Sequence, residues 1–234
     1  HKKFRDQQEH WYVDKLLIGD AHSDNAYAGT TGAEVVPYET NSIEGSNSVL
    51  KRDWDRFLGD IAEAKLFNPD FIIANMHWGL EYERIPSREQ RELADWLLRQ
   101  GVDLVIGSHP HVVQPMELRR GKEGVTDRLV VYSLGNFISN MSREHTDGGV
   151  MVKVVLGRKG LRRYIISAQY SLIYSSRYKN EQGKEDIRVV PAASWSGKNQ
   201  NSSFSVDSAL IKYVNNTRLF LKGNNKEVEE YIFE

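Results

Sequence analysis

Three apolar runs, each followed by polar residues near a glycine, constrain this chain more than any other feature of its sequence. The runs cover residues 71–76, 102–106 and 128–133. They lead, in chain order, into His77, into His109 and His111, and into Gly135 and Asn136. Short apolar runs of this kind are typical of strands that are covered on both faces. We therefore expect an α/β fold with a site at the sheet edge where these strands end.

A helix between the first two runs indicates that their strands are parallel. Ser87 and Gln90 form the pattern of a helix-capping box, and Gly101 follows the last apolar position of the predicted helix. Strand–helix–strand units with short connections are right-handed, and their two strands run in the same direction. The carboxyl ends of both strands should therefore lie at one edge, which brings together the histidines that follow them.

These three histidines predict a metal or catalytic site. Imidazole binds zinc, manganese and iron, and the turn His109-Pro110-His111 lets two rings reach one ion or a pair of ions. Taken alone, a turn of this type is more often a hydrogen-bonded loop. The presence of His77 at the end of the neighbouring strand favours the metal site.

Three other side chains in these loops are candidates for catalysis or substrate binding. Glu81 follows His77 closely, so its carboxylate could act with His109 as a general acid or base, or it could orient a histidine. A plain surface glutamate is the alternative. Ser133 and Asn136 are candidates for substrate binding, although the sequence Leu-Gly-Asn-Phe also suits a simple turn.

A weaker metal-ligand candidate lies near the start of the chain. A short strand predicted at residues 15–18 runs into Asp20 and His22. A carboxylate and an imidazole two residues apart can both reach one metal ion. The same spacing suits a polar loop, so both interpretations stay open. His145 and Asp147, in a later polar loop, are expected to be surface residues.

The rest of the sequence predicts helices and strands that support this edge of the sheet. We expect a helix over residues 49–67, antiparallel strands over 150–156 and 161–174, a short strand over 187–190 and a last helix over 206–222 that ends at Gly223. In that last helix the side chains expected to face the core are Ala209, Leu210, Tyr213, Val214 and Leu221. Residues 23–48 and 175–204 are mostly polar and predict loops.

Composition excludes several classes of function. The 234 residues carry a net charge of -1, so the chain has no overall field that would attract nucleic acid. It has no cysteine, which excludes disulfides, thiolate metal sites and cysteine nucleophiles. No apolar run approaches the roughly 20 residues that cross a bilayer, so membrane association is expected only through a segment outside this chain. We expect one domain over residues 1–234, with a C-terminal helix within 205–234 packed on it and an N-terminal part missing.

Three motifs resemble the CapA family, the poly-γ-glutamate capsule biosynthesis proteins. They are HWGLEYE at 77–83, GVDLVIGSHPHVVQPMEL at 101–118 and YSLGNFISN at 132–140. The flanking segments FRDQQE at 4–9, residues 60–79 and SREHTDGG at 142–149 are also similar to this family. The resemblance is strong over residues 50–155 and weaker towards both ends.

The resemblance implies a calcineurin-like metallophosphoesterase fold, a β-sandwich flanked by helices, with the N-terminal half only partly present. It implies two divalent metal ions, of manganese, zinc or iron, with His77, His109 and His111 as imidazole ligands. The rest of such a site comes from an upstream aspartate motif and an Asn-His motif. Asp20-Ala21-His22 could stand for the first, but FRDQQE favours an alignment in which Asp20 is incidental, and no Asn-His motif precedes residue 77.

For function, the resemblance implies a protein of capsule or poly-γ-glutamate biosynthesis or export. Such a protein would work in the extracytoplasmic cell envelope, with membrane-bound polymer synthase or export components as partners. Two alternatives stay open. One is a metal-dependent phosphoesterase, a hydrolase that acts on a small phosphorylated substrate, and the other is a scaffold that keeps the fold without catalysis.

Overall fold

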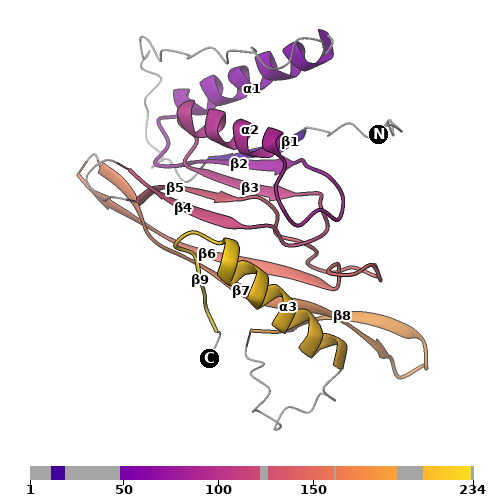
Figure 1. Cartoon of the computed structure of the whole chain (residues 1–234). Helices are drawn as coiled ribbons and strands as arrows, with labels where there is room; N and C mark the ends of the chain where they lie inside the picture. The colour runs from indigo at the N-terminus through magenta and orange to yellow at the C-terminus, as the bar shows by residue number, and fades with distance from the viewer. Residues whose placement is uncertain (1–11, 19–47, 122–125, 161, 194–207, 233–234) are drawn as a thin grey trace.

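A computed structural model of the chain describes residues 12–18, 48–121, 126–160, 162–193 and 208–232, which form two β-sheets and three helices (Figure 1). This confirms the mixed α/β class. The first sheet has the order β1-β2-β3-β5-β4. Its strands are β1 (Tyr12–Ile18), β2 (Ile72–His77), β3 (Leu104–Ser108), β4 (Met116–Arg120) and β5 (Thr126–Val131). The central strands β2, β3 and β5 are parallel, as predicted, and β1 and β4 run antiparallel at the edges.

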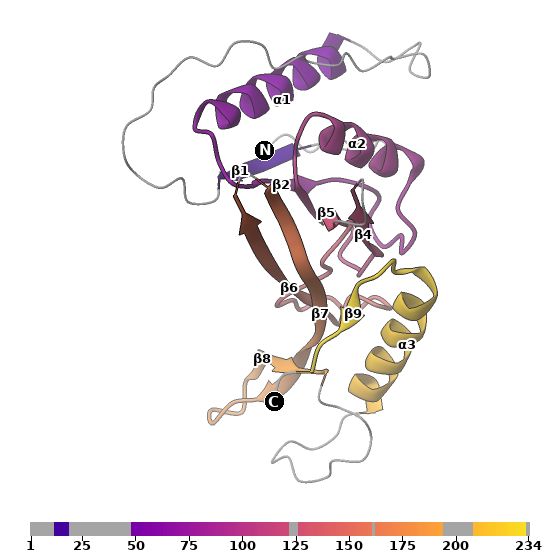
Figure 2. The same ribbon diagram turned by 90° about the vertical axis from the view of Figure 1, so that its left-hand side faces the viewer.

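Two helices, α1 (Ser48–Leu66) and α2 (Arg88–Arg99), cover one face of this sheet (Figures 1 and 2). The alternate residues Ile72, Ala74 and Met76 of β2 are buried against them. The predicted capping box of α2 is present, with Gln90 N–H donating to the Ser87 hydroxyl and Ser87 N–H donating to the Gln90 side chain. The cap sets where α2 begins. The buried apolar face of α2 then holds the connection from β2 to β3 against the sheet.

The second sheet packs on the opposite face. It is formed by β6 (Gly148–Lys159), β7 (Arg162–Lys179) and β8 (Glu185–Pro191), with β9 (Glu229–Glu230) beside β7. One buried core contains Leu104 and Leu129 of the first sheet together with Val150 and Leu172 of the second. Figure 2 shows the long β6–β7 hairpin on the side of the first sheet that lies away from α1 and α2. Two packed sheets with flanking helices are consistent with the expected sandwich.

Helix α3 (Ser208–Asn224) joins this core from the side of β7. Tyr213 lies 5.7 Å from the ring of Tyr174 and donates its hydroxyl to the carbonyl of Gly149 at 3.3 Å. Leu210, Tyr213, Val214 and Leu221 are buried as predicted. Ala209 was wrongly assigned to the inner side, since it is exposed. The helix also continues to Asn224, so Gly223 does not end it.

Other predictions differ from the structure mainly at strand bounds. β1 begins three residues before the predicted strand, and β7 extends to Lys179, into a segment predicted as loop. The short strand predicted at 187–190 is present as β8, which is longer at both ends. Strand β4 was missed because its sequence, MELRR, alternates poorly and only Met116 is fully buried. The predicted loop at 23–47 lies outside the described residues. Among the residues described, no helix is long and apolar enough to cross a bilayer.

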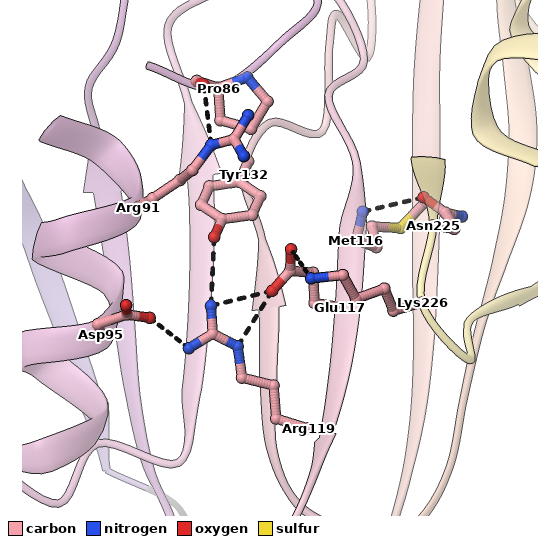
Figure 3. A network of polar contacts seen from close by, with 9 residues as sticks. All are labelled: Pro86, Arg91, Asp95, Met116, Glu117, Arg119, Tyr132, Asn225 and Lys226. Carbon is pink, nitrogen blue, oxygen red and sulfur yellow. Dashed lines mark hydrogen bonds and ion pairs between the residues drawn. The ribbon is translucent and has the colours of Figure 1, made fainter. Parts of the chain in front are cut away.

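Edge strand β4 is tied to the rest of the fold by Arg119 (Figure 3). Its guanidinium donates to Asp95 on α2, to Glu117 on β4 at 2.9 and 3.1 Å, and to the Tyr132 hydroxyl at 3.3 Å. Glu117 also accepts from Lys226 at 2.9 Å, after α3. Burial raises the pKa of Tyr132 to about 12, so its hydroxyl is protonated at neutral pH. One arginine therefore connects α2, β4 and the residue that ends β5.

Replacing Arg119 with methionine should lower the free energy of unfolding by about 1–3 kcal/mol, because Glu117 would keep one cationic partner instead of two. Arg120→Met is the matched control on the same strand. Arg120 pairs with Glu227 through side chains that are about half exposed, so its loss should destabilise the fold much less. Urea denaturation measures both changes, and equal losses would contradict the role given to Arg119.

Candidate metal centre

The parallel pairing of β2 with β3 brings the predicted histidines together. His77 lies in register with Ser108, and the N–H of the next residue, Trp78, donates to the Ser108 carbonyl at 3.1 Å. The ring centroids of His77 and His109 are 4.5 Å apart and those of His109 and His111 are 6.1 Å apart. The three imidazoles therefore form one cluster at the carboxyl end of the sheet, where the sequence placed them.

The backbone of this cluster is strained. His109 and His111 have φ values of +101° and +61°, and Tyr82 in the facing loop has +71°. Residues other than glycine reach this region at a cost of about 1–3 kcal/mol each, and such strain gathers at functional sites. The Tyr82 N–H donates to the Pro110 carbonyl at 2.7 Å, and the Ser108 hydroxyl donates to the Met76 carbonyl at 3.1 Å. These bonds hold the two loops against each other and maintain the strained turn.

Gly107 allows the close approach on which this arrangement depends. A Cβ atom there would lie 2.0 Å from the Tyr132 carbonyl oxygen and 2.4 Å from the Trp78 indole nitrogen. That nitrogen donates to the same carbonyl at 2.8 Å, inside the core. Position 107 therefore has no room for a side chain, because the ends of β2, β3 and β5 meet at this point.

Glu81, His109 and His111 could hold a metal ion. Each offers one ligand atom, and these atoms lie within 4.8 Å of one another. One carboxylate oxygen and two imidazole nitrogens make a donor set that suits zinc, manganese and iron. Glu81 is exposed and both histidines are partly buried, so the group opens to solvent on one side. His77 lies beside His109 but is not in this group.

Asn136 fixes which nitrogen of His111 can serve as the ligand. The Asn136 amide nitrogen donates to the Thr146 carbonyl at 3.0 Å, so its oxygen must face His111. His111 Nδ1 lies 3.0 Å from that oxygen, which can only accept, so Nδ1 carries the proton. The lone pair is then on Nε2, as metal binding requires. The residues present thus fit a divalent metal ion.

The wall of the site is completed by loop 143–147. Its Arg143 places the guanidinium carbon 3.9 Å from the centroid of the Tyr82 ring, and Tyr82 stacks on His111 with centroids 6.0 Å apart. Desolvation, followed by the nearby Glu81 carboxylate, raises the pKa of Tyr82, so it is a neutral phenol at pH 7. In the same loop, burial and then Arg84 lower the pKa of His145, which is therefore uncharged at neutral pH.

The remaining predicted residues stand as follows. Ser133 is fully buried, and its hydroxyl accepts from the Gly135 N–H at 3.2 Å. Asn136 is 9% exposed and its amide bonds to His111 and Thr146. Substrate binding by either residue, and catalysis by Glu81, stay predictions. Asp20 and His22 lie outside the described residues.

Sequence reasoning missed the contacts of Tyr82 and Arg143. Both lie in motifs that were noticed, HWGLEYE and SREHTDGG, but these are separated by about sixty positions in the chain. No local periodicity indicates that a side chain of the second loop stacks on one of the first. Two features of the sequence hinted at this contact: an aromatic residue next to Glu81 and an arginine in a polar loop.

The chain matches the protein family described as bacterial capsule synthesis protein PGA_cap over residues 12–141. Its similar relatives include the PGA biosynthesis protein CapA of Bacillus subtilis, 28% identical over 158 residues, which are 64% of this chain and 40% of the relative. The capsule biosynthesis protein CapA of Bacillus anthracis is 35% identical over 133 residues, which are 57% of this chain and 30% of the relative. The chain thus matches less than half the length of either relative.

Asn136→Ala should weaken the binding of Mn²⁺ or Zn²⁺ by about 10–100-fold, because His111 would lose the bond that selects its tautomer and ring orientation. His111→Ala, which removes a ligand atom, should weaken binding further. Asn140→Ala is the matched control, since Asn140 is exposed on the same loop. Isothermal titration of the metal-free protein measures all three. Wild-type affinity in Asn136→Ala would refute the orienting role.

Proposed function

Because the chain belongs to the family of bacterial capsule synthesis proteins, we propose that it takes part in the synthesis or export of a capsule polymer such as poly-γ-glutamate. The names of both relatives, which mention capsule or PGA biosynthesis, support this assignment. The proposed location is the cell envelope, outside the cytoplasm. The proposed partners are a membrane-bound polymer synthase or export components.

The observation that carries a chemical role is the group of Glu81, His109 and His111. We propose that it holds a divalent ion of manganese, zinc or iron, with a second ion where the full-length protein supplies further ligands. A bound ion supplies Lewis-acid chemistry and lowers the pKa of a coordinated water. Asn136 keeps Nε2 of His111 available, and Glu81 is placed to bind the ion or to accept a proton.

A metal-dependent phosphoesterase is the second candidate, and the same cluster favours it. A carboxylate and imidazoles at the carboxyl edge of a sheet provide the donor set of a hydrolytic metal site. The two proposals are compatible, since polymer synthesis can include a hydrolytic step. The third candidate is a scaffold without catalysis, which an incomplete set of metal ligands would favour and which would be accepted if neither metal nor turnover were found.

Deleting the gene in the organism that encodes this protein should abolish or strongly reduce its capsule polymer, because the family functions in capsule synthesis. The full-length wild-type gene should restore the polymer, and His111→Ala should not. Asn140→Ala should restore it, because Asn140 is an exposed residue on the loop of Asn136 and is not one of the three ligand residues. Extraction and quantification of surface polymer measure the outcome. An unchanged polymer in the deletion strain would refute the capsule role.

The purified full-length protein should contain a transition metal and hydrolyse a generic phosphodiester. His109→Ala should lower turnover by about 100-fold or more, because it removes a ligand from the group and disturbs its proton chemistry. Metal analysis and hydrolysis of bis-p-nitrophenyl phosphate, with and without a chelator, measure this. Metal content without turnover would exclude the phosphoesterase but leave a metal-binding capsule protein.

A further inference from the structure

Two arginines beside the metal centre have no carboxylate partner among the described residues. Arg143 rests over the ring of Tyr82, and Arg84 rests over the ring of Phe220 at 3.8 Å from its centroid. Six other arginines among the described residues lie within 4.0 Å of a carboxylate. These are Arg88, Arg119, Arg120, Arg128, Arg158 and Arg218. Arg84 and Arg143 therefore form no close ion pair among the described residues.

Both arginines belong to the same wall of the site. The loop that holds Tyr82 and Arg84 lies against loop 143–147, since Arg143 contacts Tyr82 and the charge of Arg84 acts on His145. Loop 143–147 is in turn bonded to Asn136 through the Thr146 carbonyl. Arg143, Tyr82 and His111 consequently form a stack of three side chains that leads directly to the metal group.

The aromatic rings contact the flat faces of both guanidiniums rather than their N–H groups. A ring under the flat face of a guanidinium holds it in place, while the N–H groups point outward in its plane. That edge matches the two oxygens of a carboxylate or phosphate.

Arg84 shows the cost of leaving this charge unpaired. Its Nε atom is buried and has no hydrogen-bond partner. The nearby Glu144 carboxylate pairs instead with Lys212 at 3.6 Å. Desolvation by burial lowers the pKa of Arg84, so the surroundings disfavour its charge. A half-buried cation without a close ion-pair partner is unfavourable, and an incoming anion would offset that penalty.

We propose that Arg84 and Arg143 form an anion subsite beside the metal group, which holds a carboxylate or phosphate oxyanion of the substrate. The inference rests on the proposed function, because a capsule polymer such as poly-γ-glutamate carries a carboxylate on every residue. One unit of such a polymer would lie at the metal group while a neighbouring unit binds the arginines. The net charge of -1 gives the whole chain no attraction for a polyanion, so local cations must provide it.

Binding of a fluorescent γ-linked glutamate oligomer to the full-length protein with Mn²⁺ tests this subsite. Arg143→Gln and Arg84→Gln should each weaken binding by about tenfold, because each removes charge-assisted hydrogen bonds to the oxyanion. Arg143→Lys, which keeps the charge but loses the planar edge, should bind with intermediate affinity. Arg99→Gln is the matched control: it removes the same charge from the exposed end of α2, at the opposite edge of the sheet.

Inorganic phosphate serves as a second ligand in the same measurement. A loss confined to the oligomer identifies polymer carboxylates as the ligand, and a loss confined to phosphate identifies a phosphoryl group; either supports the subsite. Unchanged affinity for both ligands in both glutamine variants overturns it, as does an equal loss in Arg99→Gln or a wild-type protein that binds neither ligand. Arg143 is exposed, so Arg143→Gln should keep the wild-type melting temperature even if Arg84→Gln does not. The capsule role is judged separately, by the deletion strain.

Discussion

The contact between Gly107 and the Tyr132 carbonyl is the constraint on which the site depends. It lets β3 approach the end of β5 so closely that no side chain fits between them, and the Trp78 indole bonds to the same carbonyl from the end of β2. Three strands are thereby fixed at one point of the sheet. The turn with His109 and His111 begins immediately after it, so its position follows from the core rather than from a mobile loop.

Part of this arrangement follows from the sequence and part does not. The apolar runs of β2, β3 and β5 are long enough to identify, and a helix between two of them makes their strands parallel, so the meeting of His77 with His109 could be predicted. Strand β4 could not, because MELRR has one fully buried residue and is held by the ion pairs of Arg119 (Figure 3). Such bonds join positions far apart in the chain and leave no periodic signal.

Asn136 illustrates the same limit within the site. Its place after an apolar run marks it as functional, and the sequence suggests an amide that meets substrate. The fold buries that amide between His111 and the Thr146 carbonyl, where it determines the tautomer of a ligand residue. The distinction depends on loop 143–147 folding back over the strand ends, which is a long-range contact. Residue type and strand position thus predict where the amide lies but not these contacts, and substrate binding by Asn136 stays a prediction.

The charges around the site would make the proposed metal binding and the proposed anion binding depend on each other. Glu81 is exposed beside His109 and His111, and its carboxylate would repel a polyanion approaching Arg143 along the stack of Tyr82. A divalent cation held by Glu81 would replace that repulsion with attraction, because the ion carries the largest local charge. An anion bound at the arginines would in turn favour the cation, since such coupling is reciprocal. The proposed site would therefore discriminate against anionic chains until it binds a metal, although its arginines are already in place.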